Sequence, residues 1–320
     1  SLESCSLRAG WPFVFAYSVG IGARGGGKHL GNAGLLKAEA KQPEAQAKAR
    51  SQLWKGIGIL AMLAGLLVAV SLSGIVTLTI AGFAELIWYV IGVLAVLYFA
   101  YVIVFACRDG LERRGVGLIF GLFIGAAFFW SGFEQAGSTM NLFAKEHTDL
   151  QIVSWDMPAG WLQQINPLLI ILLAPLMGML WIWLGQRNPS LGVKFGLGLL
   201  LLGVGFLVMA WGSNYVVDGR VSPMWLVSAY FFHTVGELCL SPVGLSSITK
   251  LSPERLVGQM MGTWFMGAAL GNLIAGLMAG RLETMTPYEL FVTVATISLV
   301  AAVVFLICSK PIRYLAAGIK

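Results

Sequence analysis

Long apolar stretches separated by short polar segments dominate this sequence. Eight stretches are long enough to cross a bilayer, because its hydrocarbon core of about 30 Å requires roughly 20 apolar residues in a helix. They cover residues 53–78, 83–106, 116–143, 163–185, 191–212, 223–249, 257–280 and 288–309. The separators contain turn and capping residues, such as Asn188-Pro189-Ser190. The pattern predicts an all-α integral membrane protein with about eight transmembrane helices.

The composition supports the same class. Hydrophobic residues make up 58% of the chain and charged residues 11%, whereas soluble domains are about half apolar and about a quarter charged. The four cysteines, Cys5, Cys107, Cys239 and Cys308, are scattered and form no C-x-x-C pair. This spacing indicates neither a disulfide framework nor a metal site.

Basic residues are distributed unevenly between the two sets of loops that alternate threading produces. Three of them, Lys145, Arg220 and Arg281, fall in one set, and sixteen fall in the other. The sixteen are Lys28, Lys37, Lys41, Lys48, Arg50, Lys55, Arg108, Arg113, Arg114, Arg187, Lys194, Lys250, Arg255, Lys310, Arg313 and Lys320. Because positive loops stay in the cytoplasm, both ends of the eight-helix segment are predicted to be cytoplasmic. The net charge of +6 then reflects topology, and no nucleic-acid partner is expected.

The first residues differ from the remainder of the chain. Residues 1–27 contain a short apolar run that Pro12 interrupts, without the basic region and cleavage site of a signal peptide. We interpret 1–27 as a remnant or disrupted segment, as in a truncated or frame-disrupted gene product. Residues 28–52 are rich in alanine, lysine and glutamate, which predicts a cytoplasmic linker.

Two acidic residues, Glu134 and Glu237, lie well inside predicted spans. A carboxylate at bilayer depth costs about 2.5–3.5 kcal/mol even on insertion scales, so it normally faces a cavity or a partner. No lysine or arginine lies deep in the eight spans. Each carboxylate is therefore expected to be protonated, hydrated, paired with a bound cation or paired with a base outside this chain. The pair predicts a transport site, and a protonated glutamate bonded within the bundle is the alternative.

Other polar residues surround these acids in the sequence. His233 lies four positions before Glu237 on the same helical face, where it would either relay a proton or bond a backbone carbonyl. Ser241-Pro242 follows Glu237 by four positions, and Asn166-Pro167 repeats the combination in another span. Both prolines are predicted to kink their helices, as in many transporter substrate sites. H-x-x-x-E supplies only two ligands, so no metal site is predicted.

Three segments resemble proton-dependent oligopeptide transporters of the major facilitator superfamily. GELCLSPVGLSSITKLSPERLVGQMMGTWFMGAALGN (236–272) is similar to that family's most recognisable carboxy-terminal segment. FWSGFEQAGSTMNLFA (129–144) resembles its seventh helix, and QQINPLLIILLAPLMGMLW (163–181) resembles its eighth. By this resemblance, residues 53–107 correspond to a transmembrane hairpin inserted between two bundles, and 108–320 to the carboxy-terminal six-helix bundle.

The resemblance implies a role for several positions. Glu237 would receive the amino terminus of a peptide, and Ser241 would line the same pocket. Asn166 would bond the peptide backbone or its carboxylate end. Glu134 would act in gating and proton coupling with a basic residue of the other bundle. Trp130 and Trp264 would line the pocket walls, although aromatic residues deep in a span more often fill packing space.

The resemblance implies the carboxy-terminal half of a proton-coupled di- and tripeptide symporter, with the proton as coupling ion and no cofactor. It would be a multi-pass protein in the lipid of a bacterial inner membrane, with a cytoplasmic carboxy terminus. The amino-terminal six-helix bundle and its E-x-x-E-R motif are absent from this sequence, so the chain is not expected to transport alone. His233 has no counterpart in the resemblance and remains a proton-coupling candidate.

Two alternatives remain at this point. A homodimer could form one cavity from two copies of the chain. An intramembrane enzyme or metal-binding membrane protein could use Glu134, His233 and Glu237, although neither G-x-S-x-G nor H-E-x-x-H is present.

Overall fold

The structure is a computed structural model, which describes residues 80–152, 154–216, 220–280 and 285–316 and isolated positions between 51 and 62. The chain forms two compact units, 1–77 and 78–320, and every helix named below belongs to the second. Apart from those isolated positions, the predicted segments 1–27, 28–52 and 53–78 lie outside the described residues.

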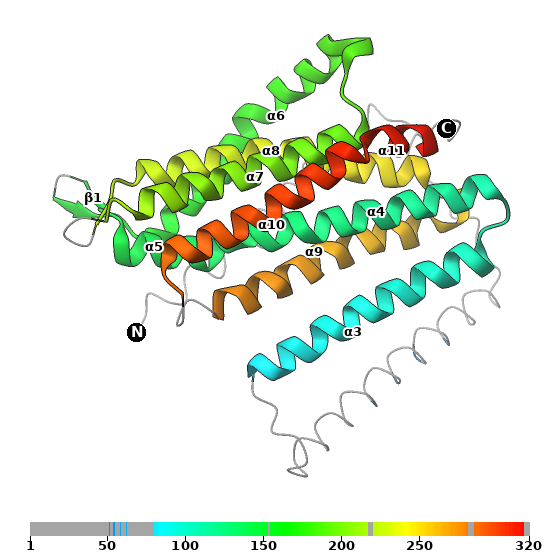
Figure 1. Cartoon of the computed structure of the whole chain (residues 1–320), viewed down its shortest axis with the longest axis horizontal. Helices are drawn as coiled ribbons and strands as arrows, with labels where there is room; N and C mark the ends of the chain where they lie inside the picture. Colours follow the sequence, from blue (N-terminus) through cyan, green and yellow to red (C-terminus); the bar gives the residue numbers. More distant parts are fainter. Residues whose placement is uncertain are drawn as a thin grey trace, which may run out of the picture. The chain divides into compact units, whose positions relative to one another are not determined.

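The second unit is almost entirely helical (Figure 1). Its helices are α3 (Ile80–Tyr101), α4 (Gly110–Phe133), α5 (Thr139–His147), α6 (Ile165–Leu184), α7 (Leu191–Ser213), α8 (Met224–Leu251), α9 (Val257–Ala279), α10 (Pro287–Ile307) and α11 (Ser309–Ala316). A single antiparallel hairpin of β1 (Gln151–Ile152) and β2 (Trp155–Asp156) interrupts the described helices. Seven described segments are long and apolar enough to span a membrane. The prediction of an all-α, multi-pass membrane protein is therefore confirmed.

Local sequence signals explain several helix ends. The carboxylate of Asp109 caps α4 by accepting a hydrogen bond from the Glu112 backbone N–H at 2.8 Å. Thr286 and Glu289 form a reciprocal capping box before α10, and Pro287 occupies its first position. Gly185 ends α6 with φ of +46°, a conformation that glycine adopts without steric cost.

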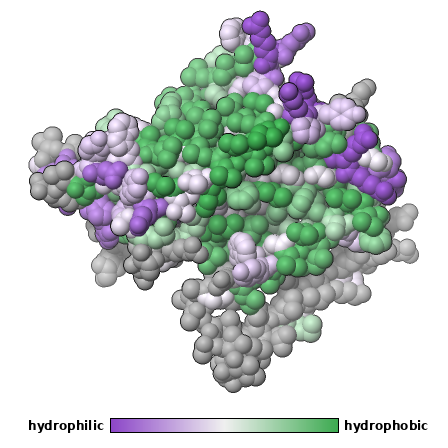
Figure 2. All heavy atoms as spheres, viewed as in Figure 1, coloured by the Kyte–Doolittle hydropathy of each residue, from purple (hydrophilic) through white to green (hydrophobic). Residues whose placement is uncertain are grey.

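The helices pack in two adjoining groups (Figure 1). α7 packs against both α8 and α10, and α6 packs on the other side against α8. In the second group α4 runs along α9, and α3 packs against α9 as well. Buried aromatic side chains fill the space between the groups, with Phe129, Phe195, Phe206 and Phe291 at most 1% exposed. Figure 2 shows a broad hydrophobic area across the middle of the face in view, as lipid contact requires.

A salt bridge ties the beginning of α4 to the beginning of α9. Arg255, in the turn Glu254–Leu256 before α9, donates to both carboxylate oxygens of Glu112, at 2.6 and 2.7 Å. The same guanidinium also donates to the Ala106 carbonyl that ends the turn after α3. These contacts fix the α3–α4 connection against the α8–α9 connection.

The predicted span 116–143 lies within one apolar helical segment, Gly110–His147, in which a short 3₁₀ helix at Glu134–Gly137 separates α4 from α5. One sequence expectation about helix shape requires correction. Pro167 does not kink a span, because it lies in the first turn of α6, where its missing N–H needs no partner. The prolines inside described helices are Pro175 in α6 and Pro242 in α8.

Lys194 was counted with the basic loop residues, although the predicted span 191–212 already includes it, and the structure buries it. It lies in the first turn of α7 with only 8% of its surface exposed. Its ammonium group lies 4.3 Å from the centre of the Trp181 ring of α6. A cation above an aromatic face is stabilised by the ring quadrupole, which explains why this lysine is tolerated inside the packing.

Candidate functional site

Three polar side chains from two helices meet where the amino-terminal end of α6 packs on α8. The amide nitrogen of Asn166 donates to the Thr234 hydroxyl at 3.0 Å and to a Glu237 carboxylate oxygen at 3.1 Å. Thr234 is fully buried and donates in turn to the Tyr230 carbonyl at 2.7 Å. Asn166 and Glu237 are only partly buried. The cluster therefore holds one carboxylate in a defined orientation while part of it stays accessible.

Glu134 lies at the break between α4 and the turn that precedes α5. Its side chain is half-buried, and its carboxylate forms no hydrogen bond or ion pair with any described residue. No described hydrogen bond joins its carboxylate to that of Glu237, which accepts from Asn166. The predicted partnership of the two acids stays a prediction.

Neither carboxylate has a basic partner in the described part of the chain. The salt bridge found there joins Arg255 to Glu112, and the buried Lys194 lies over Trp181 instead. An unpaired carboxylate in a membrane bundle is costly unless water, a proton or a cation compensates it. The arrangement is suited to receive a positive charge from outside this bundle.

His233 faces α7 and is only 1% exposed. Its ring lies 4.6 Å from the Phe206 ring, and a Cβ at Gly205 would lie 2.5 Å from its Cδ2 and Nε2 atoms. The carbonyl of Leu202 is within reach, but neither ring nitrogen makes a hydrogen bond of standard geometry with a described residue. The imidazole therefore packs against α7, and no described hydrogen bond joins it to Glu237.

The remaining predicted residues are Ser241, Trp130 and Trp264. Ser241 lies one turn after Glu237, with a buried hydroxyl that has no described partner. Trp130 is partly buried and packs edge-on against Phe133 at 5.2 Å. Trp264 is only 3% exposed, and its ring meets Phe195 edge-on at 6.3 Å. Their predicted roles as pocket walls stay predictions.

A metal-binding group is not found within the described ranges, where no three His, Cys, Asp or Glu side chains converge. Glu134, His233 and Glu237 thus do not assemble into the ligand set that the metal-binding alternative needs.

Two residues of this region were missed by sequence reasoning. Thr234 precedes Glu237 by three positions, a helical spacing that could have indicated it. Gln135 is fully buried beside Glu134, and its amide nitrogen donates to the Ala275 carbonyl of α9 at 3.2 Å. Its position next to a membrane-embedded acid was the available signal.

Comparison with known proteins identifies the family. The POT family profile matches residues 86–291. The peptide transporter YePEPT of Yersinia enterocolitica is 38% identical over 274 residues, which cover 82% of this chain and 53% of the relative. A di-/tripeptide transporter of Lactococcus lactis is 32% identical over 71% of this chain and 47% of its own length. The chain therefore spans about half the length of these relatives.

Solved structures give the same result. A mutant peptide transporter POT in complex with alafosfalin superposes with a TM-score of 0.72 at 31% identity, over 87% of this chain and 55% of the transporter. A POT family transporter in complex with 5-aminolevulinic acid superposes with a TM-score of 0.73 at 28% identity, over 83% of this chain and 55% of that transporter. The resemblance inferred from the three sequence segments is confirmed, and so is the expectation that this is not an enzyme, since the relatives are transporters. This chain belongs to the POT family.

Proposed function

We propose that this chain is the carboxy-terminal half of a proton-coupled di- and tripeptide symporter. The observation that supports this most directly is the Asn166–Glu237 pair, in which an amide orients a partly accessible carboxylate that lacks a basic partner. A peptide amino terminus supplies the missing positive charge. The names of the relatives from Yersinia and Lactococcus favour the same substrate class.

In this proposal the two ends of the cluster have different roles. Glu237 receives the substrate ammonium group, and Asn166 offers its amide oxygen to a peptide N–H. Ser241, one turn further along α8, contributes its unpartnered hydroxyl to the same pocket. Trp130 and Trp264 shape the pocket walls in another state of the transport cycle.

Glu134 is the proposed proton-coupling and gating residue. Its carboxylate lies at a helix break rather than inside a continuous helix, and such breaks are common where transporters change shape. In this proposal the two carboxylates, which have the same negative charge, are not both ionised at once, so protonation of one favours ionisation of the other. The His233 ring also lies near the Phe133 ring, and Phe133 directly precedes Glu134. In this proposal His233 contributes to proton coupling by packing beside the residue that precedes Glu134.

The opposite wall of the site is proposed to belong to an amino-terminal six-helix bundle with a basic residue facing Glu134. Residues 53–107 would be the inserted hairpin and 108–320 the carboxy-terminal bundle. We place the protein in a bacterial inner membrane with its carboxy terminus in the cytoplasm, as the distribution of basic residues favours.

Uptake of a labelled dipeptide into proteoliposomes under an inward proton gradient tests this function. We expect no uptake by this chain alone and uptake when it follows the amino-terminal bundle of YePEPT. Glu237→Gln should lower that uptake on the order of thirtyfold, because it removes one partner of a buried charge pair. Glu146→Gln, an equivalent change at an exposed position of α5, should leave uptake unchanged. Full uptake by the isolated chain, or by the Glu237→Gln chimera, would refute the proposal.

A further inference from the structure

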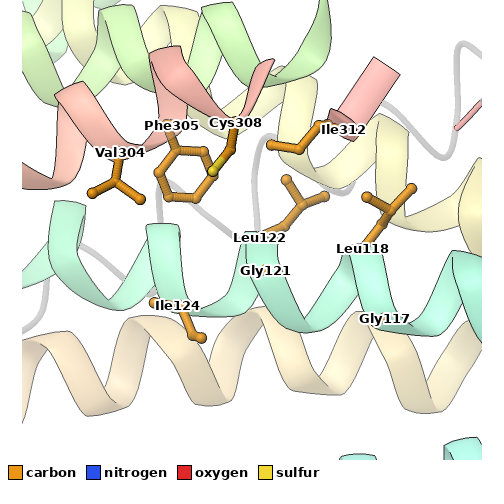
Figure 3. Close-up of a pocket in the computed structure, with 9 residues that line it drawn as sticks. All are labelled: Gly117, Leu118, Gly121, Leu122, Ile124, Val304, Phe305, Cys308 and Ile312. Atoms are coloured by element: carbon orange, nitrogen blue, oxygen red, sulfur yellow. The ribbon is translucent and has the colours of Figure 1, made fainter. Parts of the chain in front are cut away.

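An apolar groove runs between α4 and the end of α10, on a part of the surface that the proposed transport site does not use. It has a volume of about 310 Å³. Figure 3 shows side chains from α4, α10 and α11 converging on it. The lining residues are Gly117, Leu118, Gly121, Leu122, Ile124, Val304, Phe305, Cys308 and Ile312.

Two glycines make the groove deep. A Cβ atom at Gly117 or Gly121 would meet no atom within 4 Å, so neither glycine is required for close contact with another described helix. Small residues on a membrane helix usually allow a neighbour to approach closely. The missing side chains instead leave open space in an apolar groove that Leu118 and Ile312 also line, a surface that a hydrocarbon chain can contact.

Two basic residues lie next to residues that line one end of this groove. Arg114 lies one turn before Gly117 and Leu118 on the same stripe of α4, and Arg313 directly follows Ile312 in α11. Both side chains are exposed, and neither forms an ion pair with a described acid. Figure 2 shows hydrophilic residues gathered where α4 begins and α11 lies, beside the hydrophobic area.

We propose that this groove binds an anionic phospholipid, with one acyl chain along Gly117 and Gly121 and the phosphate between Arg114 and Arg313. The positive charges of Arg114 and Arg313, beside an apolar groove, match the chemistry of an anionic headgroup joined to an acyl chain. This end carries the basic loops, and anionic lipids of the cytoplasmic leaflet attract such clusters. α11, which packs against α4 and α7, would hold its basic face at headgroup level.

Photocrosslinking of the full chain in detergent micelles tests the site directly. The probes are phosphatidylglycerol and phosphatidylcholine that carry the same diazirine acyl chain, with labelled peptides mapped by mass spectrometry. We expect phosphatidylglycerol to label residues 117–124 and 304–312 on the order of tenfold more than phosphatidylcholine, because each nearby basic residue favours an anionic lipid severalfold. Unlabelled phosphatidylglycerol should compete.

Two variants separate the headgroup from the acyl chain. Arg114→Gln/Arg313→Gln should remove the preference for phosphatidylglycerol. Lys145→Gln/Arg220→Gln, an equal loss of charge at two positions predicted to lie on the opposite side of the membrane, should retain it. Gly121→Leu should fill the groove and suppress labelling by both lipids, whereas Gly178→Leu, at another open glycine, should not. Equal labelling by the two lipids would overturn the proposal. So would an unlabelled groove together with a dimer that Gly121→Leu dissociates, because a second copy would then occupy it.

Discussion

Gln135 shows how a single neutral side chain stabilises the break between α4 and α5. Its amide nitrogen donates to the carbonyls of Ser131 and, across the bundle, Ala275. Its amide oxygen accepts from the hydroxyls of Ser138, at 3.2 Å, and Thr139, at 3.0 Å. The interrupted backbone thus gains side-chain partners in a region without bulk water, where unsatisfied polar groups are costly. Gln135 therefore positions the neighbouring Glu134.

We expect Gln135→Leu to destabilise the described bundle by about 1–2 kcal/mol. The leucine keeps the volume but removes the link to α9, and hydrogen bonds between membrane helices contribute about 0.6 kcal/mol on average and up to about 1.7. Gln259→Leu provides the control, because that exposed side chain accepts one bond, from the Tyr98 hydroxyl. Unfolding in mixed micelles measures the free energy of unfolding of both variants. An equal decrease in the two variants would show that the hydrogen bonds of Gln135 stabilise the bundle no more than that of Gln259.

Part of the site could be predicted at the level of residues. Glu134 and Glu237 stand out because charge inside a span is rare, and Asn166 stands out beside Pro167, although its role came from the resemblance. Thr234 and Gln135 were missed because neutral polar residues are common in membrane helices, and their partners depend on the rotation of each helix about its axis. The same uncertainty affects His233, whose spacing from Glu237 predicted a shared face but not its packing on Phe206 of α7.

At the scale of elements, two glycines determine how closely α7 and α8 approach. A Cβ at Gly198 would lie 2.9 Å from the Gly236 carbonyl oxygen, and one at Gly236 would lie 2.7 Å from the Gly198 carbonyl oxygen. Both obstacles are backbone atoms, which cannot rotate away. Since Gly236 directly precedes Glu237, this contact also helps to fix where α8 places the Glu237 carboxylate.

Gly236→Ala should therefore destabilise the chain by about 1–3 kcal/mol, the usual cost of overpacking. In the chimera it should also reduce dipeptide uptake, because a shift of α8 moves Glu237 away from Asn166. Gly178→Ala is the matched change, since its Cβ would meet nothing within 4 Å and alanine favours a helix. Thermal unfolding should show lower stability for Gly236→Ala and unchanged stability for Gly178→Ala. Retained stability in Gly236→Ala would contradict a rigid contact.

The positions of the helices were easier to predict than their irregularities. Span length follows from bilayer thickness, so α7, α8, α9 and α10 begin and end within two residues of the predicted limits. The break after Phe133 depends on a side-chain network that hydropathy does not register. The apolar residues around Lys194 did predict a helix. The burial of the Lys194 side chain could not be predicted, because its cation–π partner, Trp181, lies on another helix, α6.

For the whole molecule, α6 is the element that most needs a further partner. None of its 20 residues is buried, although α7 contributes thirteen buried residues to the core. α6 packs against α8, and the Asn166 amide donates to the Glu237 carboxylate across this contact. Part of its surface can face lipid, but a polar edge with a carboxylate favours a protein partner or water.

We accordingly expect the amino-terminal bundle of YePEPT, produced as a separate polypeptide, to associate with this chain and cover α6. Hydrogen–deuterium exchange should slow in Ile165–Leu184 on the order of tenfold, because covered helices open less often. Exchange in Pro287–Ile307 should stay constant, since α10 already packs on α7. Glu237→Gln should leave this protection intact while lowering uptake on the order of thirtyfold, because the second bundle is expected to cover α6 along its length and not at this carboxylate alone. If α6 and α10 respond equally, or neither responds, the face presented by α6 and Glu237 does not receive the second bundle.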